Sequence, residues 1–251
     1  MKLSIVILTC NSLHRIEPCI KALLGTVGIH PIEWIMVDNG STDGSQQLVE
    51  TLLPQASLIQ NYHNEGVARA RNQGIKASTG QYVLLLDDDT QVLPNTIDTL
   101  CEYLDKQPQC AMVAPQLLNP DGSLQANALP LPSVRDKCNR IVKKLQGKKL
   151  QNFYHDKIEA QTPFQSGYLI GACQLIRKDA ITRIGLLDEQ IFYGPEDADY
   201  CLRLKKQGYE VVCLPSVRAI HDYQRQSYRL KNARLLWSHF KGLMYFWRKH
   251  Y

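Results

Sequence analysis

The chain has 251 residues, of which 44% are hydrophobic and 21% are charged, a balance typical of a globular protein with a sizeable core and not of a disordered chain. Its apolar runs all fall well short of the ~18 residues that a membrane-spanning helix requires. The formal charge of +5 is concentrated in residues 218–251, where eight Lys and Arg face a single acid, whereas residues 1–217 carry a slight excess of acids.

The first 115 residues alternate short apolar runs with longer helical patterns, as is typical of a parallel sheet buried on both faces. The apolar runs predict strands at 3–8, 33–37, 57–60, 82–86 and 111–114. The patterns between them predict helices at 16–24, 44–53, 67–77 and 95–104. The sequence therefore predicts an α/β fold with a Rossmann-like, mixed but mainly parallel sheet flanked by helices.

Beyond residue 115 the pattern is less regular. The run Asn119-Pro120-Asp121-Gly122 consists of turn-forming residues and predicts a hairpin. A basic stretch at 133–163 predicts a loop or short helix over the sheet. The apolar run 165–176, with Gly167 and Gly171, predicts one strand with close backbone approaches. The remaining patterns predict a helix, a strand and a basic helix, at 196–207, 210–214 and 225–251.

These patterns predict one domain over residues 1–217 and a helical extension over residues 218–251 that holds eight Trp, Tyr and Phe. Cationic and aromatic side chains together suit an anionic membrane surface, so one hypothesis is a peripheral helix at the cytoplasmic face of a membrane. The alternative is a helix packed on the domain or on a second subunit, as in a homodimer. Nucleic-acid binding is disfavoured because the domain is slightly acidic and contains no recognisable nucleic-acid-binding motif. The eight cysteines form no CxxC pair, which indicates reduced thiols in a cytoplasmic protein.

Three successive carboxylates, Asp87, Asp88 and Asp89, follow the predicted strand 82–86. Ligands of open α/β sheets gather at the carboxyl ends of strands, and three carboxylates there repel one another unless a cation neutralises them. We therefore expect a divalent metal site, and the alternative is an acidic loop that caps the next helix. A phosphatase with a nucleophilic Asp after such a strand is disfavoured, because Gln91 occupies the place where that motif requires Thr or Val.

Polar residues also follow the predicted strand 33–37, in the run Asp38-Asn39-Gly40-Ser41-Thr42-Asp43. Side chains at such an edge can recognise a nucleobase, while Ser41 or Asp43 caps the next helix, a role that explains Asp38 poorly. Arg71, on the predicted helix 67–77, could contact a phosphate or base near the same edge, although a lone Arg on a helix is more often solvated.

A third group of polar residues begins the predicted helix 196–207, where Gly194 and Pro195 precede Glu196 and Asp197. Acids in a first turn are ordinary helix-start chemistry, stabilised as anions by the helix dipole. Gly194 and Pro195 shape the backbone that leads to these paired acids, which also suits an ionised general base at the mouth of a site. His221, after the predicted strand 210–214 and a turn at Pro215, could supply a neutral imidazole to a metal.

Five linked motifs together resemble the family 2 glycosyltransferases over residues 3–225. They are Ile5-Val6-Ile7-Leu8-Thr9-Cys10-Asn11, Val37-Asp38-Asn39-Gly40-Ser41-Thr42-Asp43-Gly44-Ser45, Asn64-Glu65-Gly66 with Ala70-Arg71-Asn72-Gln73-Gly74, Leu86-Asp87-Asp88-Asp89-Thr90, and Pro195-Glu196-Asp197 with His221. The most similar branch contains rhamnosyltransferases of bacterial surface polysaccharides. The resemblance implies a GT-A fold, a nucleotide-diphosphate sugar donor, a saccharide or lipid-linked acceptor, and an inverting transfer that depends on Mg²⁺ or Mn²⁺.

The resemblance also implies roles for the matching residues. Thr9, Asn11 and Asp38 would contact the nucleoside, with Asn39 and Arg71 in the same pocket, and Asp87 would approach the ribose or sugar with Asp88 beside it. Asp89 and His221 would bind the metal, Asp197 would take the proton from the acceptor hydroxyl, and Glu196 would position the acceptor. Cys10 stands where many members have Tyr, and Asn39 where many have a second Asp, which leaves the nucleobase open. On family likeness dTDP-rhamnose is favoured, with UDP- and GDP-sugars as alternatives.

Two other functions stay open at this point. A sugar-phosphate nucleotidyltransferase would carry a Gly-rich, Arg-containing loop after the first strand, and the run Thr9-Cys10-Asn11-Ser12-Leu13-His14 does not match one. A non-catalytic module that binds sugar nucleotides or glycans would not need a general base. The presence of Asp197 together with Asp87, Asp89 and His221 therefore favours an enzyme.

Overall fold

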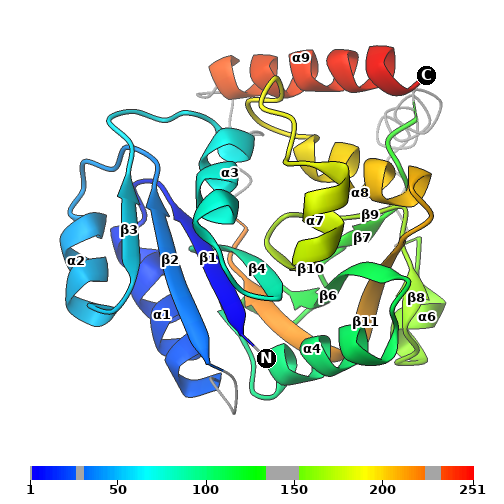
Figure 1. Ribbon diagram of the computed structural model, residues 1–251, viewed down its shortest axis with the longest axis horizontal. Coiled ribbons are helices and arrows are strands. Elements are labelled where there is room, and N and C mark those ends of the chain that lie inside the picture. The colour runs from blue at the N-terminus through cyan, green and yellow to red at the C-terminus, as the bar shows by residue number, and fades with distance from the viewer. Residues whose placement is uncertain (1, 27–30, 134–152, 224–232) are drawn as a thin grey trace.

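The computed structural model describes residues 2–26, 31–133, 153–223 and 233–251, which form one large twisted sheet with helices on both faces (Figure 1). Within these residues the sheet has nine strands in the order β3-β2-β1-β4-β10-β6-β11-β5, with β8 paired to β11. A small second sheet pairs β7 (Ala128–Leu129) with β9 (Tyr168–Leu169). The predicted α/β architecture with a mixed, mainly parallel sheet is confirmed.

The first half of the sheet is parallel, as the alternating sequence pattern predicts. Its strands are β1 (Leu3–Thr9), β2 (Ile32–Asp38), β3 (Ser57–Gln60) and β4 (Tyr82–Asp87). The apolar runs of β1 and β4 are buried along almost their whole length because helices cover both faces. The register places Thr9 opposite Asp38 and Leu8 opposite Asp87. The polar residues at these strand ends therefore lie side by side along one edge.

The predicted single strand at 165–176 is wrong. The segment forms three short strands, β8 (Phe164–Gln165), β9 and β10 (Cys173–Arg177). Gly171, between β9 and β10, lies so close to the Arg71 guanidinium that any side chain at this position would collide with it. β10 is antiparallel to both β4 and β6 (Cys110–Leu118), so β6 runs in the same direction as β4 and points to the same edge.

The strand predicted at 210–214 is longer than the sequence pattern indicates. β11 (Glu210–His221) continues past Pro215, and its register against β6 shifts between Leu214 and Arg218. Such an irregularity accommodates a proline, which cannot donate to the ladder. The unpredicted β5 (Thr90–Val92) is antiparallel to β11 and pairs Thr90 with His221. His221 is therefore the last residue of a strand parallel to β6, at the edge where Asp87 ends β4, and does not follow a turn.

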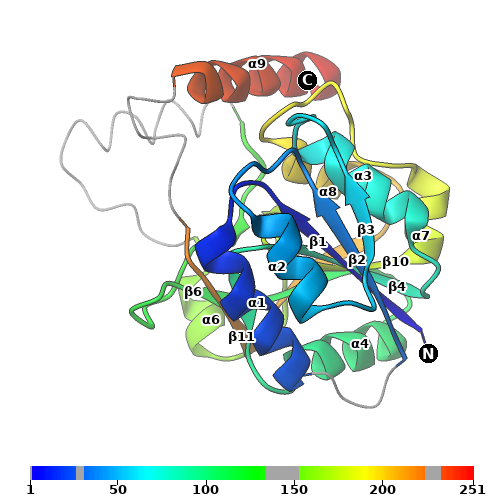
Figure 2. The same cartoon turned by 90° about the vertical axis from the view of Figure 1, so that its left-hand side faces the viewer.

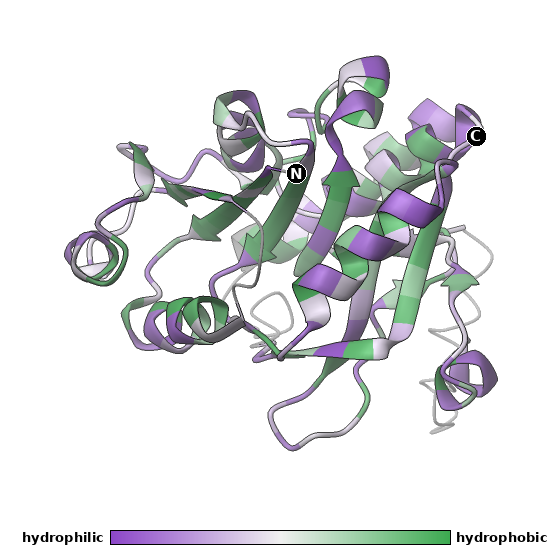
Figure 3. Cartoon of the chain, turned by 60° about the horizontal axis from the view of Figure 1, so that its bottom comes forward, coloured by the Kyte–Doolittle hydropathy of each residue, from purple (hydrophilic) through white to green (hydrophobic). Residues whose placement is uncertain are grey.

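Helices cover the two faces of the sheet in two groups (Figure 2). One face carries α1 (Leu13–Thr26), α2 (Ser45–Leu52) and α4 (Thr96–Lys106), and the other carries α3 (Val67–Ala77), α8 (Glu196–Lys206) and the unpredicted α7 (Lys178–Ile184). Ile5 and Ile7 point to the face covered by α1, α2 and α4, and Val6 points to the face covered by α3, α7 and α8, as strand alternation requires. Figure 3 shows the result: the central strands are mostly hydrophobic, and the helices carry both hydrophobic and hydrophilic residues.

The connection between β6 and β7 contains the predicted hairpin. Asn119 N donates to Ser123 O at 2.8 Å, and Leu118 pairs antiparallel with Leu124 across the turn. Of the basic stretch predicted as a loop or short helix, residues 134–152 lie outside the described residues. The remainder contains the short helix α6 (His155–Glu159).

The helix α9 (Ala233–His250) lies across the side of the molecule to which β2 and β3 point (Figure 1). Of the helix predicted at 225–251, residues 225–232 lie outside the described residues, and the described part is helical up to His250. Lys249 Nζ lies 2.7 Å from carboxylate oxygens of both Asp188 and Asp199, which fixes the end of α9 to the domain. Among the described residues, no helix combines the length and the apolar character needed to cross a membrane.

Candidate active site

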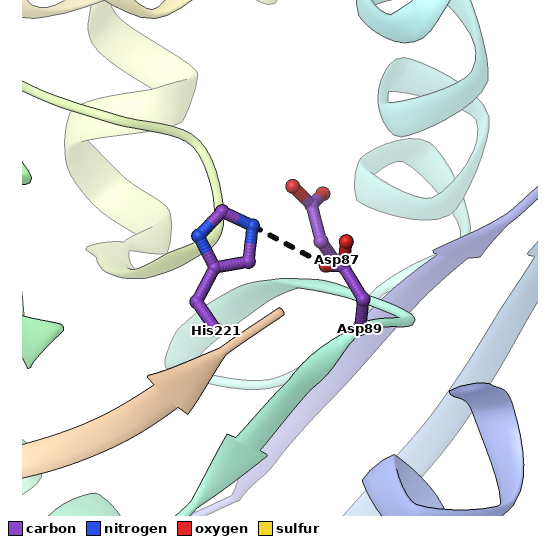
Figure 4. Close-up of side chains that lie close together, drawn as sticks. All are labelled: Asp87, Asp89 and His221. Atoms are coloured by element: carbon purple, nitrogen blue, oxygen red, sulfur yellow. Dashed lines mark ion pairs between the residues drawn. The ribbon is translucent and has the colours of Figure 1, made fainter. Parts of the chain in front are cut away.

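The carboxyl edge of the sheet brings together three side chains that can ligate a metal (Figure 4). Asp87 ends β4, Asp89 lies in the turn between β4 and β5, and His221 ends β11. One ligand atom from each of the three lies within 4.8 Å of the others. The sequence predicts Asp89 and His221 as the metal ligands and Asp87 as a donor contact. The structure places Asp87 in the same cluster.

The side chain of Gln125 fixes the orientation of His221. Gln125 Oε1 lies 2.6 Å from His221 Nδ1, so Nδ1 carries a proton and Nε2 is left facing the carboxylates. The amide of Gln125 is itself oriented, because its Nε2 donates to Asn119 Oδ1 at 2.9 Å and to the carbonyl of His221 at 3.2 Å. Sequence reasoning missed Gln125, since a glutamine after a hairpin turn has no signature of its own.

The donor set fits a divalent cation. His221 Nε2 lies 3.3 Å from Asp89 Oδ1, which is buried and has no well-aligned hydrogen bond within the described part of the chain. Burial alone would lower the pKa of His221, but the close carboxylate of Asp89 outweighs burial and raises that pKa. The pocket therefore favours positive charge between the imidazole and the carboxylates. Two carboxylates and an oriented imidazole can hold Mg²⁺ or Mn²⁺.

Asp88 does not belong to this cluster of possible metal ligands. Its Oδ2 accepts a hydrogen bond from the backbone N–H of Cys10 at 3.3 Å, which ties the turn after β4 to the end of β1. Burial raises the pKa of Asp88 to about 6. The structure therefore gives Asp88 a contact that joins two strand ends, and its place beside the donor stays a prediction.

Arg71 connects the metal cluster to the acids that begin α8. The side chain is buried on α3, and its Nη2 donates to Asp87 Oδ1 at 2.5 Å and to the carbonyl of Gly171 at 2.8 Å. Its Nη1 lies 3.6 Å from Glu196 Oε1. Burial would lower the pKa of Arg71, but Asp87 and Glu196 raise it, so the group stays cationic. The solvated alternative for Arg71 is wrong because the side chain is buried, and its contact with a phosphate or base stays a prediction.

Glu196 and Asp197 differ in their surroundings although they are adjacent. Glu196 is buried, and its Oε2 has no hydrogen-bond partner among the described residues. Burial raises the pKa of Glu196, opposed by the charge of Arg71. Burial and the neighbouring charge of Glu196 raise the pKa of Asp197 to about 7. A carboxylate that titrates near neutral pH is suited to accept a proton from a hydroxyl group.

The ends of β1 and β2 form the expected nucleoside edge, but several of its polar groups are already paired. Asp38 is fully buried and accepts hydrogen bonds from Ser41 N at 3.2 and 3.3 Å, a contact within the loop before α2 and not a cap of that helix. Asn39 Oδ1 accepts from Glu65 N at 3.0 Å, which holds the loop before α3. Asn11 Oδ1 accepts from Thr42 N at 2.9 Å, and the fully buried side chain of Thr9 lies beside Asp88.

Comparison with known sequences gives one family and a consistent group of relatives. The model of the family described as "Glycosyl transferase family 2" matches residues 4–185. The N-acetylglucosaminyl-diphospho-decaprenol L-rhamnosyltransferase of Mycobacterium tuberculosis (strain CDC 1551 / Oshkosh) is 28% identical over 76% of this chain and 66% of its own length. The dTDP-rhamnosyl transferase RfbF of Shigella flexneri is 28% identical over 73% of this chain and 64% of its own. The chain thus spans just under two thirds of these relatives.

Solved structures show the same fold. The mannosyltransferase PcManGT from Pyrobaculum calidifontis, in complex with GDP-Man and Mn²⁺, has a TM-score of 0.66 and 19% identity over 97% of this chain and 64% of its own. GalNAc-T7 with UDP, GalNAc and Mn²⁺ has a TM-score of 0.66 and 16% identity over 90% of this chain and 44% of its own. These likenesses show the GT-A fold that the sequence motifs imply.

Proposed function

The chain belongs to glycosyl transferase family 2, and from that premise we propose that it transfers a sugar from a nucleotide-diphosphate donor to an acceptor hydroxyl with inversion at the anomeric carbon. The single observation that carries the proposal is the linked set of charges at the carboxyl edge of the sheet. Asp87, Asp89 and His221 can hold a cation, and Arg71 joins this cluster to Glu196, beside the candidate base Asp197.

The donor would lie over the ends of β1, β2 and β4. Mg²⁺ or Mn²⁺ held by Asp89 and His221, with Asp87, would stabilise the negative charge of the leaving nucleoside diphosphate. Thr9, Asp38 and Asn39 lie at the ends of the neighbouring strands, where a nucleoside would be recognised, with Asn11 beside them.

The acceptor would approach from the start of α8. In the proposed step the acceptor oxygen forms a bond to the anomeric carbon while the bond from that carbon to the diphosphate oxygen breaks. The proton of the hydroxyl passes to Asp197, and the electron pair of the broken bond stays on the diphosphate. The pKa of Asp197, raised to about 7, supports this role, because a base that titrates near neutral pH accepts a proton effectively at that pH. The buried Glu196, unpaired at Oε2 within the described residues, would position the acceptor.

The names of the relatives narrow the substrates that we propose. One relative is named for the transfer of L-rhamnose to N-acetylglucosaminyl-diphospho-decaprenol, and another for dTDP-rhamnose. We therefore favour dTDP-rhamnose as the donor, with UDP- and GDP-sugars as alternatives, and a saccharide or lipid-linked acceptor of cell-surface polysaccharide synthesis.

Two experiments test the proposal in sequence. Thermal shifts with dTDP, UDP and GDP, each with Mn²⁺ or with EDTA, identify the nucleotide, because a ligand at ~100 times its Kd adds ~2.7 kcal/mol of stability. Transfer of labelled sugar from the matching donor to N-acetylglucosaminyl-diphospho-polyprenol then tests the reaction. Metal-dependent binding of one nucleotide together with transfer supports the proposal. Binding of a nucleotide without transfer to any saccharide or lipid-linked acceptor would instead support a non-catalytic binding module.

A further inference from the structure

We propose that the exposed side of α9 is a docking surface for an anionic lipid bilayer. The inference rests on the proposed function, since it places a lipid-linked acceptor next to the site. The surface consists of an apolar ridge, Leu236, Trp237, Phe240 and Met244, and a basic flank, Lys241 and Arg248.

The helix has three distinct faces because its residues follow one another at about 100°. The first face packs on the domain through Gly242, Leu243 and Phe246, all buried. The four apolar residues of the ridge lie on a second face about 100° wide, given their spacing along a helix. Their exposed fractions are 53% for Leu236, 56% for Trp237, 49% for Phe240 and 49% for Met244. An apolar stripe that normally covers a core is thus turned outward.

Charge complementarity selects the occupant of this surface. Lys241 and Arg248 follow the ridge on the third face of the helix, and Lys241 Nζ lies 5.5 Å from the centroid of the Trp237 ring. No acidic residue occurs between Ala233 and His250. A helix with Trp, Phe and Leu on one face and Lys and Arg beside them matches the interface of an anionic bilayer, where the rings enter the headgroup layer and the cations meet phosphate. A second copy of a cationic helix would be repelled by the same charges.

The surface is connected to the acceptor side of the site. On its buried face, Gly242 packs directly against the carbonyl of Gly194 and the ring of Pro195, the two residues before Glu196. Figure 1 shows α9 on the side to which the strands of the parallel half point. A bilayer against the exposed side of α9 would therefore bring the headgroup region, where a lipid-linked sugar lies, close to the loop that directly precedes Glu196 and Asp197.

Vesicle binding tests the proposal without the need for a substrate. Vesicles with equal amounts of phosphatidylcholine and phosphatidylglycerol should bind the full chain in flotation, and pure phosphatidylcholine should bind it much less. The variant K241E/R248E should lower the partition coefficient at least ~25-fold, because each basic residue near such a surface contributes about 1 kcal/mol. The variant W237S/F240S should lower it at least ~10-fold.

Control variants change side chains of the same kinds elsewhere on the surface. K21E/K106E reverses two charges on α1 and α4, and L24S removes an exposed apolar side chain on α1 that is 46% exposed; both should bind as the parent does. Equal loss in these controls, or no binding to anionic vesicles, would overturn the proposal. So would a dimer that W237S/F240S dissociates in gel filtration, which would assign the ridge to a second copy. Transfer assays without vesicles, with saccharide acceptors and with lipid-linked acceptors in detergent, separate the two hypotheses. Absence of transfer to all of them contradicts the proposed function, whereas vesicle binding reports on α9 alone.

Discussion

Gln125 Oε1 lies 2.6 Å from His221 Nδ1, and this contact decides which nitrogen of the imidazole faces Asp89. Gln125 Nε2 donates to Asn119 and to the backbone carbonyl of His221, which fixes the amide with Oε1 toward Nδ1. Because an amide oxygen can only accept, Nδ1 must carry the proton. His221 then presents the lone pair of Nε2 to the cluster, the form that binds a metal.

Q125A should therefore weaken Mn²⁺ binding ~10-fold to 100-fold while leaving the fold intact, as loss of an outer-shell partner of a histidine ligand does. Q125E, which keeps an acceptor for Nδ1–H, should retain more of the affinity. Titration calorimetry with Mn²⁺ alone measures both. Gln165, an exposed residue that pairs with Glu210, supplies the control Q165A, which should bind as the parent does. Parent-like affinity in Q125A would show that His221 needs no such orientation.

The parallel half of the fold could be predicted from the sequence because its information is local. Buried runs such as Leu3 to Leu8 end in polar residues, and the carboxyl ends of parallel strands share one edge, so Asp38 and Asp87 are placed by chain order alone. The sequence pattern predicts that the strand starting at residue 210 ends at residue 214, because Pro215 is a local stop signal. Pairing with β5 and β6 extends the strand to His221. The pairing involves residues far apart in sequence, which no local pattern records.

The contacts within the site were the least predictable part. The motif that contains Arg71 predicts that this residue lies near the site. The contact between Arg71 and Asp87 depends on the packing of α3 against the sheet, which no motif records. Asp38 and Asn39 were expected to face a ligand, yet most of their observed hydrogen bonds hold neighbouring loops. Side chains at strand ends can serve the backbone or a ligand, and the residue type does not distinguish these uses.

Asp197 should be required for turnover but not for donor binding. D197N removes the proton acceptor at almost constant volume, so kcat should fall ~10²-fold to 10⁴-fold while the Kd of the nucleotide changes within a few fold. Isothermal titration and a transfer assay measure the two quantities. E17Q on α1, a neutralised carboxylate in an exposed pair with Lys21, is the control and should leave both unchanged. Unchanged turnover in D197N would remove Asp197 from the mechanism.

The pH profile of the parent enzyme follows from the same group. Burial and the charge of Glu196 raise the pKa of Asp197 to about 7, and only the ionised form accepts a proton. The kcat should therefore rise with pH through about 7 and level off above it, and one pH unit below the pKa about a tenth of the base is ionised. E196Q removes the neighbouring charge and should shift the midpoint to lower pH. If the pH profile of E196Q has the same midpoint as that of the parent, the charge of Glu196 does not raise the pKa of Asp197.

Gly171 should be needed for the position of the Arg71 guanidinium. A methyl group at residue 171 would collide with that guanidinium, so G171A should displace Arg71 from Asp87 and Glu196 without removing any charge. We expect a loss of ~1–3 kcal/mol in stability, typical of overpacking, and a fall in transfer rate of at least ~10-fold. Gly25, which has open space around it on α1, is the matched control, and G25A should leave activity unchanged. Parent-like rates in a folded G171A would show that transfer does not depend on this contact.

The packing of α9 on the loop before α8 should affect catalysis as well as stability. An added methyl group at Gly242 would collide with the carbonyl of Gly194, so in G242A either α9 or the loop must move. Because Glu196 and Asp197 follow this loop directly, we expect G242A to lower kcat and to shift the pH midpoint assigned to Asp197, with a stability loss of ~1–3 kcal/mol. L236A, on the exposed side of the same helix, should change neither kcat nor the midpoint with a water-soluble acceptor. Thermal melting and the pH profile of kcat separate the two effects. A G242A variant that melts earlier but keeps the parent's kcat and midpoint would show that α9 stabilises the domain without positioning the base.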